Sequence, residues 1–201
     1  MTRSGLRERK REATAHALAE AAFELAMARG LDAFVIDDVA GRAGYSRRTF
    51  ANHYSCKEAA VASVAYASME AATGALEDVP DGVPLLEATH AVLRLQLTTA
   101  ALSRMREVMS LARVYPSLEP QVYHVQHRMR LEAEQRMLAV AAGRYPALYV
   151  SLLCGAVYGM VSAALEGLVD VRLPGDLSHR PGAMDFDDFL DDVFKHLRTG
   201  F

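Results

Sequence analysis

The side chains best suited to recognition chemistry lie between residues 46 and 54, where polar and cationic groups recur at helical spacing. They are Arg47, Arg48, Thr49, Asn52 and His53, and they fall on one side of a short helical pattern. Arginine can pair with guanine or hold a phosphate, and hydroxyl, amide and imidazole groups can bond to base edges or backbone oxygens. Phe50 points to the other side of the same pattern. The segment therefore has a polar reading face on a hydrophobic anchor, which is what a recognition helix needs.

Two short helices with a tight turn between them are expected to position these groups. Helical patterns cover residues 37–43 and 47–54, and Gly44 and Tyr45 separate them. Glycine adopts the left-handed conformation at a helix end at little cost, and Ser46 can cap the second helix with its hydroxyl. This arrangement predicts a helix-turn-helix.

A bracing helix is expected from residue 12 to residue 29, with Leu18, Ala22 and Leu25 on its apolar stripe and Gly30 as its end. Ahead of it, residues 1–11 are strongly basic and predict a mobile arm. Such an arm is either a solvated terminus or a segment that lies along a DNA backbone or reaches into a minor groove. The small core behind the two short helices is then expected to hold Leu31, Phe34, Ile36, Val39 and Phe50.

Lys57 lies in the first turn of the following helix, which begins near residue 55 and is expected to run to about residue 76. A cation in that position is unfavourable for the helix dipole unless an anion is near. A DNA phosphate could be that anion, and the alternative is a solvated lysine.

The charge distribution supports a nucleic-acid partner for the N-terminal part. The chain of 201 residues has a net charge of −3, but residues 1–57 carry ten Lys and Arg against seven Asp and Glu. Residues 58–201 are acidic. The basic end is thus the end with the helix-turn-helix.

The rest of the chain predicts an all-α fold. A linker is expected at residues 77–84, followed by helices over 85–102, 104–114, 118–143, 146–169 and 186–197, with a loop over 172–184 and no strands. We therefore expect two domains: a helix-turn-helix DNA-binding domain with a basic arm at residues 1–57, and a helical effector-binding and dimerisation domain at residues 58–201.

The stretch from Ala147 to Leu165 carries no charge and contains Gly155 and Gly159 at the spacing of a membrane helix pair. It is rich in small residues and lacks polybasic flanks, so we expect a buried helix in place of a membrane span. Together with the amphipathic last helix, it predicts a homodimer through the last two helices of each subunit.

An effector pocket is expected among the middle helices, where a largely apolar cavity with a few polar groups could form. Its candidate residues, each of which could equally be ordinary core, are Met109, Tyr115, Tyr123, His127, Tyr149 and Tyr158.

Signatures of catalysis, of a metal and of a cofactor are not evident in the sequence. There is no glycine-rich phosphate loop and no recognisable catalytic Ser/His/Asp arrangement. His124 and His127 have a spacing seen in metal sites, but they fit better as polar residues of a pocket or surface. Cys56 and Cys154 show no metal or disulfide spacing, which favours a reducing compartment, and we expect a cytoplasmic protein without cofactor or metal.

The first 60 residues resemble the tetracycline-repressor (TetR) family of bacterial regulators. The resemblance lies in Ala21-Ala22, Arg29-Gly30, Ile36 to Ala40, Ala43 to Ser46, Thr49-Phe50, His53-Tyr54 and Lys57-Glu58. It implies a homodimer, a three-helix DNA-binding domain and a helical ligand-binding core. It also implies that Ser46 to Thr49 begin the recognition helix, that Asn52 and His53 face the duplex, and that Tyr54 and Lys57 contact phosphates.

Three features depart from the family pattern. Val35 stands where a threonine is common, Ala26 where an aromatic residue is common, and Arg47-Arg48 give an unusually basic helix start. Phe23 or Met27 is then expected to fill the space beside Leu25.

These observations predict a ligand-responsive, DNA-binding transcriptional regulator, most simply a repressor released from a palindromic operator by a largely apolar small molecule. The alternatives are a helical small-molecule-binding protein or enzyme with a vestigial helix-turn-helix, and a membrane-tethered regulator.

Overall fold

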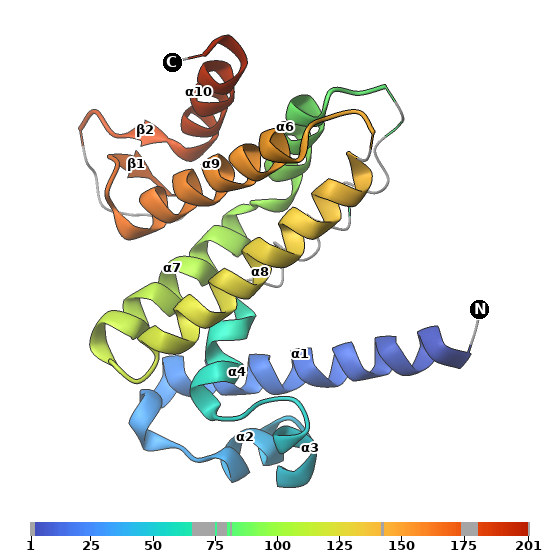
Figure 1. Cartoon of the computed structure of the whole chain (residues 1–201). Helices are drawn as coiled ribbons and strands as arrows, with labels where there is room; N and C mark the ends of the chain where they lie inside the picture. Colours follow the sequence, from blue (N-terminus) through green and yellow to red (C-terminus); the bar gives the residue numbers. More distant parts are fainter. Residues whose placement is uncertain are drawn as a thin grey trace. The chain divides into compact units, whose positions relative to one another are not determined.

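The computed structural model describes residues 3–65, 75, 80, 82–141, 143–173 and 181–200. Helices dominate the described residues, so the all-α prediction is confirmed (Figure 1). The chain forms two compact units: Met1–Ala65 with Ser110–Val125, and Tyr66–Met109 with Gln126–Phe201.

The first unit is built on one long helix. It contains α1 (Arg3–Arg29), a 3-10 turn (Leu31–Ala33), α2 (Ile36–Arg42), α3 (Arg47–Ala51) and α4 (Lys57–Val64), and α1 packs along α2 and α4 (Figure 1). Leu18, Leu31, Phe34, Val39 and Phe50 are buried at its centre. Apolar burial of this kind supplies most of the stability of short helices, which are marginal alone.

The prediction that residues 1–11 form a mobile arm is wrong, because α1 already begins at Arg3. Most residues that precede Glu12 are good helix formers, and the helix that packs on α2 and α4 extends through them once nucleated. The bracing helix is thus longer at its N-terminus than its apolar stripe indicates.

The second unit holds α6 (Leu85–Gln96), most of α7 (Thr99–Val114) and α8 (Glu119–Val140), α9 (Ala147–Glu166) and α10 (Phe186–Thr199). The ends of α7 and α8 that meet at residues 115–118 belong to the first unit. α10 packs against α6 and buries Phe186, Leu190 and Phe194.

Several predicted boundaries are corrected. The break expected near residue 103 lies at Leu97 and Thr98, because the Thr98 hydroxyl caps the next helix by accepting from Ala101 N–H. Two-residue strands, β1 (Val171–Arg172) and β2 (Met184–Asp185), pair in parallel where no strand was expected, since so short a pair leaves no sequence pattern. The predicted helix after Lys57 is described only to Val64, and most of the predicted linker and part of the 172–184 loop lie outside the described residues.

α9 has one buried and one open side. Val150, Leu153, Cys154 and Val157 are buried, whereas Leu148 and Leu152 are 71% and 65% exposed. Of the described helices, α9 alone has the length and composition to cross a membrane, a test that the core helix of a soluble protein also passes.

Candidate nucleic-acid interface

α3 turns a polar side outward and buries the opposite side. Phe50 is 0% exposed, and Ser46 Oγ accepts from Thr49 N–H at 3.1 Å, which confirms the predicted anchor and cap. The turn before it relies on Gly44, whose φ of 74° is left-handed. The outward side holds the residues expected to meet DNA, all exposed or half-buried: Arg47, Arg48, Thr49, Asn52 and His53.

The two adjacent arginines have different surroundings. Arg47 Nη1 lies 3.1 Å from Asp37 Oδ2 of α2, so it ties the two helices of the motif together. Among the described residues, no ion pair joins Arg48 to a carboxylate. Arg48 is thus the arginine whose guanidinium fork is available to a base or phosphate.

His53 follows α3, where it is half-buried. Burial lowers the pKa of His53 below its usual value, and the nearby charge of Arg11 lowers it further. The imidazole is therefore mainly uncharged at neutral pH, so it can donate one hydrogen bond and accept another. The next residue, Tyr54, donates to the Ala15 carbonyl of α1 at 3.0 Å, so the basic start of α1 lies close to the end of the recognition helix.

Tyr54 and Lys57, expected at phosphates, also bind within the domain. Tyr54 Oη donates to the Ala15 carbonyl at 3.0 Å and accepts from Ser63 Oγ. Lys57 Nζ donates to the carbonyl oxygens of Leu31 and Phe34 at 2.6 and 2.8 Å. Two of its three N–H groups are thus bonded within the domain, and the third remains for a phosphate. The sequence predicted either a phosphate contact or a solvated lysine, and neither alternative includes these internal bonds.

The departures at Val35 and Ala26 are accommodated locally. Val35 offers no acceptor at the start of α2, but Asp38 accepts from Val35 N–H at 2.8 Å, which keeps half of a capping box. Beside the buried Ala26, Phe23 is buried and Met27 exposed, so Phe23 fills the space.

The six residues expected around an effector are not gathered into one site. Met109 and Tyr158 come together through Gln126: Tyr158 Oη donates to Gln126 Oε1 at 3.2 Å, and Gln126 Nε2 lies 4.0 Å from Met109 Sδ. Gln126 is buried, and it was missed although it falls on the buried stripe of α8 with Val122 and Met137.

The other expected effector residues lie elsewhere. The Tyr115 hydroxyl occupies the space beside Gly30 in the first unit. Tyr123 and His127 are exposed on α8, and Tyr149 stacks on Tyr145 at the start of α9. Helical spacing places these residues on α8 and α9, but only packing shows which sides of those helices are covered.

Comparison with known proteins identifies the N-terminal unit. Residues 18–64, from the middle of α1 to the end of α4, match the family model described as bacterial regulatory proteins, tetR family. The chain therefore carries a DNA-binding domain of the TetR family. It is a DNA-binding transcription regulator with the helix-turn-helix described above. No curated protein matches its sequence.

Solved structures resemble the regulator over nearly all of its length. A transcriptional regulator from Rhodococcus sp. Rha1 is 22% identical, with 90% of this chain and 91% of that chain covered and a TM-score of 0.50. A TetR/AcrR-family regulator from Thermobifida fusca is 18% identical, covering 96% and 98%, with a TM-score of 0.48. At this identity the Rhodococcus structure shows a shared fold.

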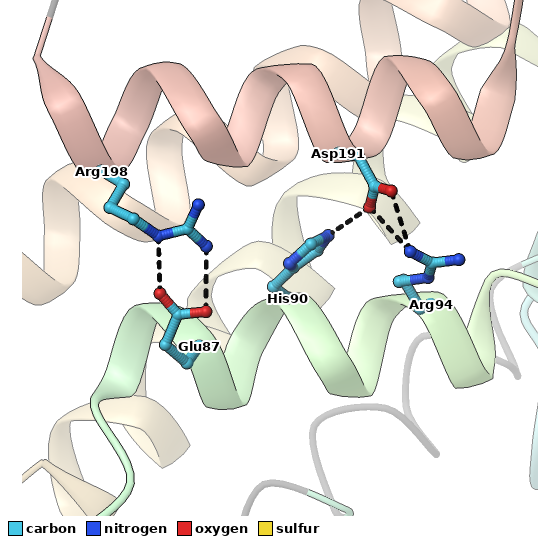
Figure 2. A network of polar contacts seen from close by, with 5 residues as sticks. All are labelled: Glu87, His90, Arg94, Asp191 and Arg198. Atoms are coloured by element: carbon cyan, nitrogen blue, oxygen red, sulfur yellow. Dashed lines mark hydrogen bonds and ion pairs between the residues drawn. The ribbon is translucent and has the colours of Figure 1, made fainter.

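A polar network joins α6 to α10 in the second unit of the regulator. Arg198 donates twice to Glu87, at 2.7 and 2.9 Å, while Asp191 binds both His90 and Arg94 (Figure 2). The two helices run antiparallel, so the ion pairs lie at either end of the shared face. Between them the His90 ring stacks on Phe194, with centroids 4.5 Å apart.

The described residues contain no group of three or more His, Cys, Asp or Glu side chains that could hold a metal ion. His124 and His127 are both exposed on α8. Cys56 and Cys154 are free thiols; Cys56 Sγ accepts from Ala59 N–H at the start of α4, and burial raises the pKa of Cys154 to about 11.

Proposed function

We propose that this regulator is a homodimeric repressor that leaves a palindromic operator when a small molecule binds its second unit. The observation that carries the proposal is the outward polar side of α3 on the buried Phe50. Residues 1–57 are the DNA-binding domain and residues 58–201 the effector and dimerisation domain in this proposal, and the protein works in the cytoplasm.

Arg48 is the base-reading arginine in this scheme. Its neighbour Arg47 is paired with Asp37, so fewer of its donors are available for a base edge and those that remain are left for a backbone phosphate. A bidentate arginine reads the O6 and N7 atoms of guanine, so each half-site should contain a guanine opposite Arg48. Asn52, Thr49 and His53 supply the remaining hydrogen bonds to the groove, with Ser46, Tyr54 and Lys57 at its phosphate edges.

The open side of α9 supports dimerisation through the last two helices. Leu148, Leu152, Gly155 and Gly159 follow one another along its exposed side at helical spacing. The small residues allow a second helix to approach closely. Burial of the exposed leucines against that helix removes apolar surface from water and so favours the dimer.

α10 has charges of opposite sign at its two ends. It begins with Asp187 and Asp188 and ends with basic residues that include Lys195 and His196. Antiparallel pairing with α10 of a second copy would bring the acidic start of each helix to the basic end of the other. A two-fold axis would repeat this charge contact once for each protomer.

The effector site is proposed around Gln126, Tyr158 and Met109, in the second unit. A buried amide and a phenol among apolar residues such as Met105 and Val157 could orient a mostly apolar molecule with one polar group. Productive DNA binding needs the two recognition helices of the dimer about 34 to 36 Å apart, the spacing of one DNA turn. A ligand that binds better to a dimer with another spacing would therefore lower the affinity for DNA.

Footprinting of the regulator's own promoter region, followed by binding titrations of Arg48→Ala, tests the proposal. The variant should bind the protected operator at least about fivefold more weakly, since a lost bidentate base contact amounts to about 1 to 3 kcal/mol and about 1.4 kcal/mol is tenfold. Arg144→Ala is the matched control, because Arg144 is an exposed arginine of the second unit. A protein that protects no DNA would instead support a small-molecule-binding protein or enzyme with a vestigial motif.

A further inference from the structure

The buried side of α1 changes character at Thr14. From Thr14 onward this side carries Leu18, Ala22 and Leu25 and is buried. Positions three, four and seven residues before Thr14 lie on the same side of a helix, and they are Arg11, Lys10 and Arg7, all exposed. The side of α1 that packs into the core after Thr14 is therefore cationic and exposed before Thr14.

The helix-turn-helix anchors α1 where this change occurs. Thr14 Oγ1 lies 3.5 Å from Tyr45 Oη, and the Ala15 carbonyl accepts from Tyr54 Oη at 3.0 Å. With a rise of about 1.5 Å per residue, Arg11 lies about 4.5 Å and Arg7 about 10 Å further along the axis. Tyr45 lies in the turn before α3 and Tyr54 lies just after α3. The cationic part of α1 therefore begins beside these two residues and runs outward from them.

Arg11 is close enough to His53 for its charge to lower the pKa of that imidazole. His53 directly follows the recognition helix, so the cationic side of α1 and the reading side of α3 border one another. A duplex that contacts Asn52 and His53 would continue past Arg11.

The basic residues are poorly placed for the helix alone. Like charges three and four positions apart on a helix repel, and Arg7 has this spacing to Lys10 and to Arg11. Among the described residues, no ion pair joins Arg7, Lys10 or Arg11 to a carboxylate. An anionic partner would relieve this repulsion.

We propose that Arg7, Lys10 and Arg11 form a second DNA-binding surface that grips backbone phosphates outside the half-site read by α3. This rests on the proposed operator-binding function and names further contacts for it. An α-helix with side chains is about 10 to 12 Å across, whereas the minor groove is about 6 Å wide, so the helical form favours phosphates over minor-groove insertion.

The test compares two operator duplexes by fluorescence anisotropy in a salt series. One duplex ends at the outer edges of the two half-sites, and the other extends ten base pairs beyond each edge. The variants are Arg7→Ala/Arg11→Ala, Arg9→Ala as the control that removes a charge from another side of the same helix, and Arg48→Ala. Alanine preserves helix propensity, and circular dichroism confirms folding.

On the extended duplex, the double variant should reduce the slope of log affinity against log salt by about four, two contacts in each protomer. On the short duplex it should match the wild-type protein. A wild-type slope on the extended duplex, or an equal loss with Arg9→Ala, would overturn the proposal. Arg48→Ala should weaken binding to both duplexes alike. If it did not, the assignment of Arg48 as the base-reading residue would be refuted, whereas the proposed phosphate contacts of α1 would be unaffected.

Discussion

Lys57 ties the start of α4 to the connection between α1 and α2 by donating to the Leu31 carbonyl across 2.6 Å. Its ammonium group also lies 5.0 Å from the centre of the Phe34 ring, over a residue of the buried core. Lys57 of α4 thus holds the segment between α1 and α2 through two carbonyl oxygens and an aromatic ring. This gives Lys57 a role in the stability of the reading unit in addition to any contact with DNA.

Lys57→Met should lower the free energy of unfolding by about 2 kcal/mol or more, because hydrogen bonds to a charged group contribute about 1.5 to 3 kcal/mol each. Urea titration followed by circular dichroism measures this. Arg128→Met is the control, since Arg128 is largely exposed on α8. Equal stability of the two variants would contradict the bracing role.

Asp37→Asn should strengthen DNA binding while leaving stability within about 1 kcal/mol of the wild type. The Arg47 pair is exposed, so it contributes little to folding, and its loss frees a cation beside the duplex. Anisotropy titrations on the operator measure the affinity. Weaker binding by this variant would mean instead that Asp37 positions Arg47 for its contact.

Gly30→Ala should destabilise the first unit, because a Cβ there would lie within contact of the Tyr115 hydroxyl and Gly30 has a φ of 83°. With φ 83° and ψ 154°, Gly30 has a backbone conformation that essentially only glycine adopts, and it costs another residue about 1 to 3 kcal/mol. In a Tyr115→Phe background the clash with the hydroxyl disappears and only the strain remains.

A double-mutant cycle on thermal or urea unfolding separates the two terms, and a coupling energy of zero between positions 30 and 115 would show that they do not touch. Gly143→Ala is a control, since Gly143 also has a positive φ, of 76°, but a Cβ added there would meet nothing within 4 Å. It should show the strain without the coupling.

Glu87→Gln should remove a pH-dependent part of stability. The hydrogen bond from Arg198 is the main cause that lowers the pKa of Glu87 below its usual value. A carboxylate with a lowered pKa stabilises the fold above its unfolded pKa and loses that contribution as pH falls through its folded pKa.

The stability difference between wild type and Glu87→Gln should therefore be present at pH 6 and fall away below about pH 4. Urea titrations at stepped pH measure it, with Glu119→Gln on the exposed start of α8 as the control. A difference that stayed constant with pH would rule out the ion pair as its source.

The sequence by itself determined the helix-turn-helix and the all-α class. The turn depends on Gly44, the cap on Ser46 and the anchor on Phe50, and each acts on residues within one helical turn of itself. Such local conformational preferences can be read from neighbouring residues. The acidic start and basic end of α10 are of the same kind.

Only the tertiary structure decided which distant groups meet. Lys57 is 26 residues from Leu31, and Tyr115 is 85 positions from Gly30. Tyr158 faces Gln126, while Tyr123, three positions before Gln126 on the same helix, is open to solvent. Adjacent positions on a helix are turned by about 100°, so a small difference in how two helices pack changes which side chains are covered, and no local pattern records that choice.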